Sequence, residues 1–394
     1  MDPRLNPFAP GAGTPPPELT GRDDLIESAS IALDRIAGGL SARSMVLFGL
    51  RGVGKTVLLN HIRMAAEANG VYTVPIEAPE GRSLPAILLP SLRSSVIRVS
   101  RTAVAKAGLQ KVLNGLASFA KAFKLTYEDI EFSVDLTPSE GVADSGDLEN
   151  DLGELLTLLG QHAAQDNTVF CIFIDELQYV AEDQLAALIT ALHRVNQAQL
   201  PVTVFAAGLP QLLGQLGKAK SYAERLFDFR EIGALGEDDA RDAITLPAAK
   251  QNVQFQPDAI REIIRATQCY PYFLQEWGQH SWRFADRSPI TFEHASSATD
   301  AAIAQLDTSF FRVRFDRLTP SEKRYMRAMA ELGPGPHRSG DVAEILQRKV
   351  TSLAPTRSSL IRKGMAYSPA HGDIAFTVPL FDGFMKRIMN LQRA

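Results

Sequence analysis

Cysteine and tryptophan are scarce in this sequence of 394 residues, which contains only two of each. Two cysteines, Cys171 and Cys269, are too few for a disulfide framework or for a cysteine-based zinc cluster. Both stand in apolar or aromatic surroundings. We therefore expect them to be buried thiols, kept reduced in a cytoplasmic protein.

Long apolar runs are also missing. No run approaches the ~18 residues that a membrane-spanning helix needs, and the first residues, MDPRLNPFAPGAG, have no apolar signal core. This excludes a helical membrane protein and makes a secretion signal unexpected. We predict a cytoplasmic protein with no membrane partner.

Acidic residues are absent from residues 81–127, which contain eight Lys or Arg, whereas residues 128–154 contain ten Asp or Glu and no base. The simplest interpretation is an insertion, at about residues 81–147, whose two halves neutralise each other. A nucleic-acid face on residues 93–124 is the alternative. Within the acidic half, YEDIEFSVDL alternates like a half-exposed strand.

Charge is uneven over the whole chain. The net charge is −4, but residues 306–394 hold 15 Lys or Arg and 8 Asp or Glu, a net charge of +7. A basic C-terminal module on an acidic body indicates either a polyanionic partner or an ordinary basic surface.

A glycine-rich turn follows the apolar run at residues 44–49 and precedes an apolar helix. Gly49, Gly54, Lys55 and Thr56 fit the pattern G-x-x-x-x-G-K-[ST], in which backbone N–H groups surround phosphates. Lys55 is expected to reach the outer phosphates and Thr56 to bind Mg²⁺. The predicted phosphate-binding residues are Gly49, Leu50, Arg51, Gly52, Val53, Gly54, Lys55, Thr56 and Val57.

A second motif supplies acids. The continuous apolar run TVFCIFIDE ends in Asp175 and Glu176, at the carboxyl end of a predicted buried strand, where parallel sheets bind ligands. Asp175 is predicted to hold Mg²⁺, and Glu176 to polarise an attacking water. Together with the first motif, this pair predicts hydrolysis of ATP.

Short buried strands alternate with helices from residue 44 to residue 232. This alternation predicts an α/β fold, a P-loop NTPase parallel sheet with helices on both faces. In the strand predicted at residues 71–78, Pro75 indicates a sheet edge or a strand end. Residues 237–284 are predicted to be all-helical.

Further segments resemble the AAA+ superfamily of ATPases, including its STAND branch and its archaeal-type, origin-recognition-related branch. PPPELTGRDDLI resembles the box that precedes the P-loop, which implies that Leu19 and Arg22 lie near adenine. TQCYPYFLQEW resembles a stretch of the helical lid, which implies that Pro271 approaches the nucleotide. The family has a glycine where this sequence has Cys269.

The same resemblance implies an arginine finger, a residue that reaches the nucleotide of a neighbouring subunit, and Arg225 stands in its place. A surface arginine paired with Glu224 or Asp228 is the alternative. The family's polar sensor is replaced by Ala206-Ala207-Gly208, for which Gln178 is a candidate substitute. No clear lid arginine is present, although Arg283 is a candidate.

Residues 319–380 predict three helices followed by two short strands, which resembles a winged helix-turn-helix. This resemblance implies DNA binding by the third helix, with Thr356, Arg357, Arg362 and Lys363 as contacts. Winged helices also serve as protein-binding modules, and in STAND proteins they lock a closed state.

The predicted organisation is therefore an extended strap (1–20), an ATPase core (21–232), a helical lid (233–305) and a winged helix (306–394). The predicted function is an ATP- and Mg²⁺-dependent AAA+ switch that hydrolyses ATP slowly, self-associates when ATP-bound and binds duplex DNA. The alternative is a STAND-type signalling ATPase whose winged helix is a latch or protein-binding module. In that case we expect a separate effector or sensor protein as partner.

Overall fold

A computed structural model describes residues 1–11, 13–100, 106–125 and 141–390. The chain divides into two compact units. The sheet unit comprises Arg22–Phe48 and Lys55–Glu231, and the helical unit comprises Met1–Gly21, Gly49–Gly54 and Ile232–Ala394. In the part of the chain that the structure describes, no helix is long and apolar enough to cross a membrane.

The sheet unit is built on five strands in the order β2-β3-β4-β1-β5, and every pair is parallel. The strands are β1 (Ser44–Phe48), β2 (Tyr72–Glu77), β3 (Phe170–Asp175), β4 (Val202–Gly208) and β5 (Phe227–Glu231). The predicted parallel sheet is confirmed. Pro75 lies on the edge strand β2, as expected, because an edge tolerates a residue without an N–H donor.

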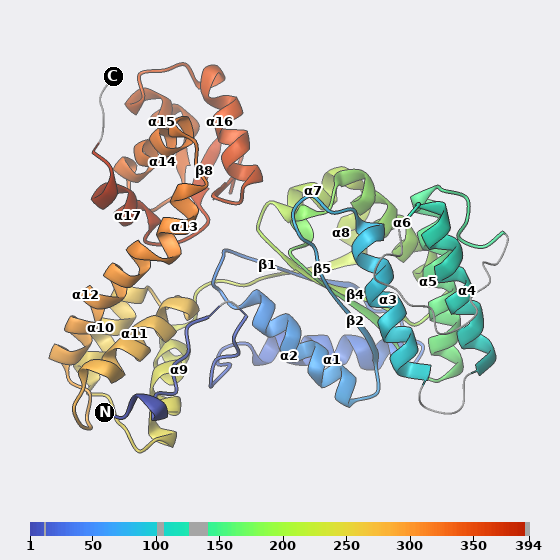
Figure 1. Ribbon diagram of the computed structural model, residues 1–394, viewed down its shortest axis with the longest axis horizontal. Coiled ribbons are helices and arrows are strands. Elements are labelled where there is room, and N and C mark those ends of the chain that lie inside the picture. Colours follow the sequence, from blue (N-terminus) through green and yellow to red (C-terminus); the bar gives the residue numbers. More distant parts are fainter. Residues whose placement is uncertain (12, 101–105, 126–140, 391–394) are drawn as a thin grey trace. The chain divides into compact units, whose positions relative to one another are not determined.

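Helices cover both faces of this sheet (Figure 1). They are α1 (Asp23–Ala37), α2 (Lys55–Ala68), α3 (Leu84–Ser100), α4 (Lys106–Ala122), α5 (Leu148–Gln165), α6 (Glu182–Gln197), α7 (Leu212–Ala219) and α8 (Ala223–Leu226). Along β3, Phe170, Ile172 and Ile174 join one hydrophobic core with helices α3 to α8. The alternate residues Cys171 and Phe173 are equally buried but lie outside that core, so they face the side covered by α2.

The described part of the basic segment packs on the sheet through one side of its helices, while Lys111, Lys121 and Lys124 are exposed. Its two helices contribute apolar side chains such as Leu88 and Leu116 to the core of the sheet unit. The guanidinium of Arg98 donates to the Thr73 carbonyl at 3.0 Å and lies 3.5 Å from a Glu67 oxygen. The strand expected at YEDIEFSVDL lies outside the described residues.

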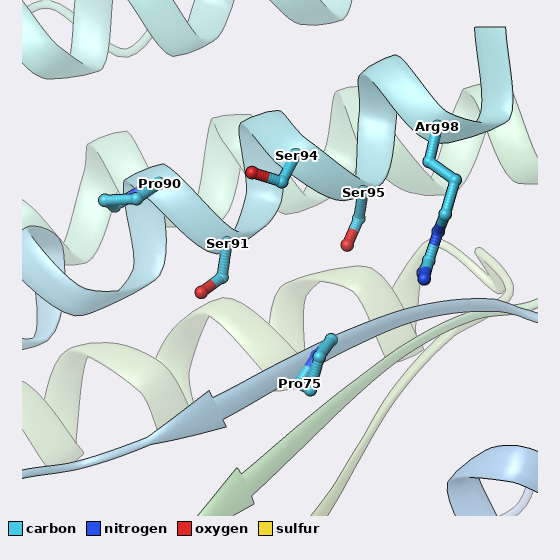
Figure 2. Close-up of a pocket in the computed structure, with 6 residues that line it drawn as sticks. All are labelled: Pro75, Pro90, Ser91, Ser94, Ser95 and Arg98. Carbon is cyan, nitrogen blue, oxygen red and sulfur yellow. The ribbon is translucent and has the colours of Figure 1, made fainter. Parts of the chain in front are cut away.

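A hollow of about 310 Å³ lies between α3 and the edge strand β2 (Figure 2). It is lined by Pro75, Pro90, Ser91, Ser94, Ser95 and Arg98. None of these residues belongs to the glycine-rich turn or to the Asp-Glu pair. The hollow is therefore separate from the residues that the two motifs predict to act on a nucleotide.

The helical unit contains the predicted lid, whose main elements are all α-helices. They are α9 (Glu237–Lys250), α10 (Pro257–Thr267), α11 (Pro271–Phe284), α12 (Phe292–Thr308) and, beyond the lid, α13 (Phe310–Asp316). Phe273, Trp277 and Trp282 are almost fully buried. These aromatic side chains form the lid core and are not displayed for stacking on a ligand.

The N-terminal strap packs along α11. Phe8 is 2% exposed and fills the space left by Gly278, where an added Cβ would meet the Phe8 ring at 2.6 Å. Asn6 Nδ2 donates to the Gln279 carbonyl at 3.2 Å, and Trp282 Nε1 donates to the Asp2 carbonyl at 3.0 Å. The strap therefore helps to complete the lid core.

The C-terminal module contains α14 (Pro320–Leu332), α15 (Ser339–Ile345), α16 (Val350–Arg362) and α17 (Phe381–Ile388). Thr319 and Glu322 form the capping box that begins α14. The sequence predicts a two-stranded sheet here, but the structure has three strands in the order β6-β8-β7. β6 (His337–Arg338) pairs with the free edge of β8 (Asp373–Phe376), whose other edge pairs with β7 (Ala366–Tyr367).

Candidate functional site

The glycine-rich turn runs from the end of β1 to the first residue of α2. We name its residues Gly49–Gly54 the phosphate turn. An added Cβ at Gly49 would lie 2.0 Å from the Ile232 carbonyl oxygen, so no other residue fits. Gly52 has a φ of 85°, which favours glycine, and its open side is occupied by Tyr270 and Tyr272. A glycine turn directly before a helix N-terminus is the chain arrangement that anion-binding loops use.

The first turn of α2 and the end of β3 meet at two residues. Thr56 Oγ1 donates a hydrogen bond of 2.6 Å to Asp175 Oδ2. Burial raises the pKa of the Asp175 carboxyl, the Thr56 hydrogen bond and the Lys55 ammonium lower it, and the neighbouring Glu176 raises it. Because burial disfavours the ionised form of Asp175, a cation bound next to this carboxylate would stabilise it.

These two oxygens fit a magnesium ion. Mg²⁺ accepts oxygen ligands at about 2.0–2.1 Å in octahedral geometry and usually takes only one or two carboxylates. Adjacent ligands of such an ion lie about 3 Å apart, close to the separation of Thr56 Oγ1 and Asp175 Oδ2. Thr56 and Asp175 are the residues that would hold it, as the sequence predicts.

Glu176 has a constrained backbone and a defined partner. Its φ of 55° lies in the left-handed region, which costs a residue other than glycine about 1–2 kcal/mol. Gln178 Nε2 donates to Glu176 Oε2, and Gln178 Oε1 accepts from the Leu209 N–H at 3.0 Å. Gln178 therefore connects the predicted general base to the residue that follows β4.

The small residues at the end of β4 make room for Gln178. An added Cβ at Gly208 would lie 2.7 Å from Gln178 Oε1 and equally close to Leu212. The Ala206-Ala207-Gly208 sequence lacks a polar side chain of its own. Gln178, which is 4% exposed, supplies the polar group at this place.

The phosphate turn is contacted by the lid and by the C-terminal module within the helical unit. Tyr272 N–H donates to the Gly52 carbonyl at 3.2 Å, and the Tyr270 hydroxyl donates to the Arg51 carbonyl. The Arg51 N–H donates to the Thr377 carbonyl at 3.2 Å. Sequence reasoning missed Thr377, because a backbone carbonyl acceptor leaves no signature in residue type.

The lid residues named from the sequence lie at the start of α11. Pro271 is its first residue, directly before Tyr272. Cys269 has a φ of 56° and so adopts the left-handed conformation for which the resembling family uses glycine. Leu19 is half-buried in the strap, where the next residue, Thr20, donates through Oγ1 to the Asp239 carbonyl at 3.0 Å. Arg22 belongs to the sheet unit and is also half-buried.

Arg283 lies in the last turn of α11 and is exposed. It is twelve residues after Pro271, which at 1.5 Å per residue is about 18 Å along the helix. This places it far along α11 from Tyr272, which contacts the phosphate turn. Arg314 of α13, which lies beyond the lid motif, packs on the ring of Phe310, and this ring stacks on Tyr272.

Arg225 lies on the short helix α8 and is exposed, directly before β5. Asp228, one of the two acids that could have paired with it, forms an ion pair with Arg230 at 2.8 Å. Over the described ranges, Arg225 has no ion-pair partner. This leaves its guanidinium available to another molecule.

The four predicted DNA contacts have different surroundings. Arg362 is exposed and Thr356 is half-buried on α16. Arg357 donates to Ser368 Oγ and to the Asp373 carbonyl, each at 2.7 Å. Lys363 forms a 2.8 Å ion pair with Glu322, which is 3% exposed. Arg357 and Lys363, two of the four predicted DNA contacts, thus already have partners within the C-terminal module.

Two family models match separate parts of the chain. Residues 18–205 match the family described as AAA ATPase domain. Residues 308–385 match a family described as a domain of unknown function (DUF8462). The first match covers the phosphate turn and the Asp-Glu pair. No curated protein matches the chain.

The whole chain is similar in fold to the Walker-type ATPase PABY2304 of Pyrococcus abyssi. The identity is 16%, the match covers 97% of this chain and 99% of that one, and the TM-score is 0.61. Weaker similarities are to the Aeropyrum pernix ORC1 protein in complex with DNA (16% identity, 95% and 94% covered, TM-score 0.45) and the Thermotoga maritima RuvB Holliday junction branch migration motor (14%, 94% and 95%, 0.45).

Proposed function

We propose that the protein is an ATP-binding switch that hydrolyses Mg²⁺-ATP slowly. The observation that carries this proposal is the 2.6 Å hydrogen bond between Thr56 and Asp175, with Glu176 next in the chain. This arrangement places a hydroxyl, a carboxylate and a candidate base at the carboxyl end of β3, where parallel sheets bind their ligands.

Each residue has a distinct role in this proposal. The phosphate turn donates backbone N–H groups to the phosphates, and Lys55, which is 7% exposed, neutralises the outer ones. A bound Mg²⁺ would supply charge neutralisation on the phosphate oxygens. Glu176 accepts a proton from the attacking water, and Gln178 orients its carboxylate. We expect slow turnover because Ala206-Ala207-Gly208 carries no polar side chain, and the Gln178 side chain at this place is already hydrogen-bonded to Glu176 and to the Leu209 N–H.

The state of the nucleotide would reach the C-terminal module through the phosphate turn. The hydrogen bond from the Arg51 N–H to the Thr377 carbonyl supports this coupling, since it joins the turn to the residue after β8. A ligand that favours a conformation of the turn without this bond would also favour a different position of the module.

We propose that the module is a winged helix-turn-helix and that duplex DNA is its ligand. The net charge of +7 over residues 306–394 and the exposed Arg362 support this. The second candidate is the STAND-type latch, in which the module holds the nucleotide site closed. The contact between Arg51 and Thr377 favours this candidate, as does the engagement of Arg357 and Lys363 within the module.

Two experiments test these proposals on the full chain. Phosphate release from Mg²⁺-ATP should fall about 10²–10⁴-fold in Glu176→Gln, the range for loss of a general base, while ATP binding is retained. Hydrolysis by this variant at the wild-type rate would show that Glu176 is not the base.

For the module, duplex-DNA affinity is measured across a salt series with and without ATP. DNA binding predicts a steep salt slope that flattens in an Arg357, Arg362 and Lys363 triple replacement. No binding at low salt would exclude the DNA proposal and leave the latch.

A further inference from the structure

A polar face of α3 lies over the free edge of the sheet. Its residues Ser91, Ser94, Ser95 and Arg98 are spaced so that they share one side of the helix. Together with Pro75 of β2 they line most of the hollow of about 310 Å³. The Ser91 and Ser95 hydroxyls and the Arg98 side chain point from α3 towards β2 (Figure 2). All these residues belong to the sheet unit.

The serine hydroxyls in the hollow have no partner in the protein. Over the ranges that the structure describes, the side chains of Ser91, Ser94 and Ser95 make no hydrogen bond. Ser95 is only 4% exposed. A hydroxyl that is buried without a hydrogen bond is unfavourable. A ligand in the hollow that accepts a hydrogen bond from Ser95 therefore removes this cost.

Arg98 spans the edge of β2 and supplies positive charge. Its Nη2 donates to the Thr73 carbonyl at 3.0 Å and lies 3.5 Å from a Glu67 oxygen, which leaves the N–H donors on Nε and Nη1 for a ligand. Glu67 also pairs with Arg63 at 2.7 Å, so two guanidinium groups share one carboxylate. This cluster keeps a net positive charge, and residues 81–127 add no acid to it.

The free edge of β2 is closed to another strand. Tyr72 and Ala78 donate their N–H groups to β3 at 2.9 and 3.0 Å. Peptide groups alternate in direction along a strand, so those of Thr73 and Pro75 face the free edge. Pro75 has no N–H to donate, and Arg98 already donates to the Thr73 carbonyl. Because both features disfavour strand addition, the hollow fits a small molecule and not an extended peptide.

We propose that this hollow binds a small molecule that carries a phosphate group. Arg98 pairs with the phosphate, and Ser91 and Ser95 donate to its oxygens. A phosphate accepts hydrogen bonds from several directions, whereas a carboxylate offers only two oxygens. The volume of about 310 Å³ lies at the lower end of the range for ligand pockets, roughly 300–1,000 Å³, and suits inorganic phosphate or a short phosphomonoester. The site shares no residue with the phosphate turn or the Asp-Glu pair, so this inference goes beyond the proposed function.

The experiment measures binding of glycerol 3-phosphate and of inorganic phosphate to the full chain by calorimetry. Saturating Mg²⁺-ADP is present, so that the phosphate turn is occupied. Both phosphates should bind, glycerol should not, and acetate should bind at least tenfold more weakly. Tighter binding of glycerol 3-phosphate would identify an organic phosphate as the ligand, and equal binding would identify phosphate itself. Binding of neither phosphate, or of acetate as tightly, would overturn the inference.

Variants locate the binding in the hollow. Arg98→Gln should weaken binding of glycerol 3-phosphate about tenfold or more, since charge-assisted hydrogen bonds are lost, and Ser95→Ala about threefold. Arg82→Gln is the matched control and should stay within twofold, because Arg82 is an exposed cation of the same segment that does not line the hollow. Unchanged affinity in folded Arg98→Gln, or an equal loss in Arg82→Gln, would contradict the site.

Two further outcomes are separable. If Arg98→Gln unfolds, the double variant Ser91→Ala, Ser95→Ala takes its place, and an affinity within twofold of the wild type would exclude the site. If the wild type binds no ADP, the proposed function fails. The comparison of hollow variants with Arg82→Gln still decides this inference, since none of these residues lies in the phosphate turn.

Discussion

Thr56 Oγ1 donates a hydrogen bond of 2.6 Å to Asp175 Oδ2, and this bond joins the first turn of α2 to the end of β3. The two residues lie 119 positions apart in the sequence. The parallel sheet brings them together, because β3 ends at the same edge of the sheet at which the helix after β1 begins.

This pair predicts a specific dependence on magnesium. Asp175→Asn removes a charged ligand but keeps the size of the side chain, so the gain in ATP affinity on adding Mg²⁺ should fall about 10-fold or more. Affinity in the presence of a chelator should change little. The measurement is an ATP titration with Mg²⁺ and with chelator. An undiminished effect of Mg²⁺ in Asp175→Asn would show that the ion binds elsewhere.

Gln178 is predicted to be a positioning residue. Gln178→Ala leaves the buried Leu209 N–H without its acceptor, which should cost about 1–3 kcal/mol of unfolding free energy. It also releases Glu176, so kcat should fall about tenfold while KM stays within twofold. Gln215→Ala is the control, because Gln215 donates to the Gln178 carbonyl at 3.3 Å and does not bond to Glu176. A rise in KM with unchanged kcat would contradict the positioning role.

The C-terminal module should lose stability in acid because of Glu322. Burial raises the pKa of Glu322, but hydrogen bonds from Lys363, Thr319 and Ser359 outweigh burial and lower it to about 2, from an ordinary value of 4.5. A carboxylate with a lowered folded-state pKa stabilises the protein above its unfolded-state pKa, and this contribution is lost as the pH falls towards 2. The difference in unfolding free energy between wild type and Glu322→Gln should thus be constant above about pH 5 and shrink between 4.5 and 2.

Hydrogen exchange of α14 and α16, measured between pH 3 and pH 6, checks this prediction. Glu331→Gln is the control, because Glu331 is 46% exposed in its pair with Arg327 and an exposed pair contributes little. A difference between Glu322→Gln and wild type that is the same at pH 3 and pH 6 would contradict the assignment.

Arg225 is predicted to act on the nucleotide of a neighbouring copy. Arg225→Ala should lower ATP turnover at concentrations where the protein self-associates and leave it unchanged where sedimentation shows a monomer. The exposed Lys218 on α7 provides a control, since Lys218→Ala removes a nearby cation of the sheet unit. An equal loss of turnover in the proven monomer would exclude a role between subunits.

The sequence predicts those parts of the fold and candidate site that depend on contiguous residues. The phosphate turn, the Asp-Glu pair, the edge position of Pro75 and the capping box at Thr319 each rest on residues close together in the chain. Their backbone geometry follows from local sterics and hydrogen bonding, so a short motif is enough.

The remaining features depend on distant partners. Nothing in the type of Lys363 distinguishes a DNA contact from the ion pair with Glu322 that the structure contains. Arg283 resembles a lid arginine in sequence position, but the rise of α11 takes it away from the start of the helix. β6, the strand of the C-terminal sheet that the sequence did not predict, consists of only two residues, too few for a pattern of alternation.

The position of Phe8 under Gly278 has a consequence for synthesis of the protein. About 270 residues separate the strap from the helix it packs on. At the usual rate of roughly 5–20 residues per second, the ribosome needs on the order of 14–54 seconds to make the intervening chain. During that interval the Phe8 ring lacks its native partner, so α11 must compete for it with every apolar surface that emerges earlier.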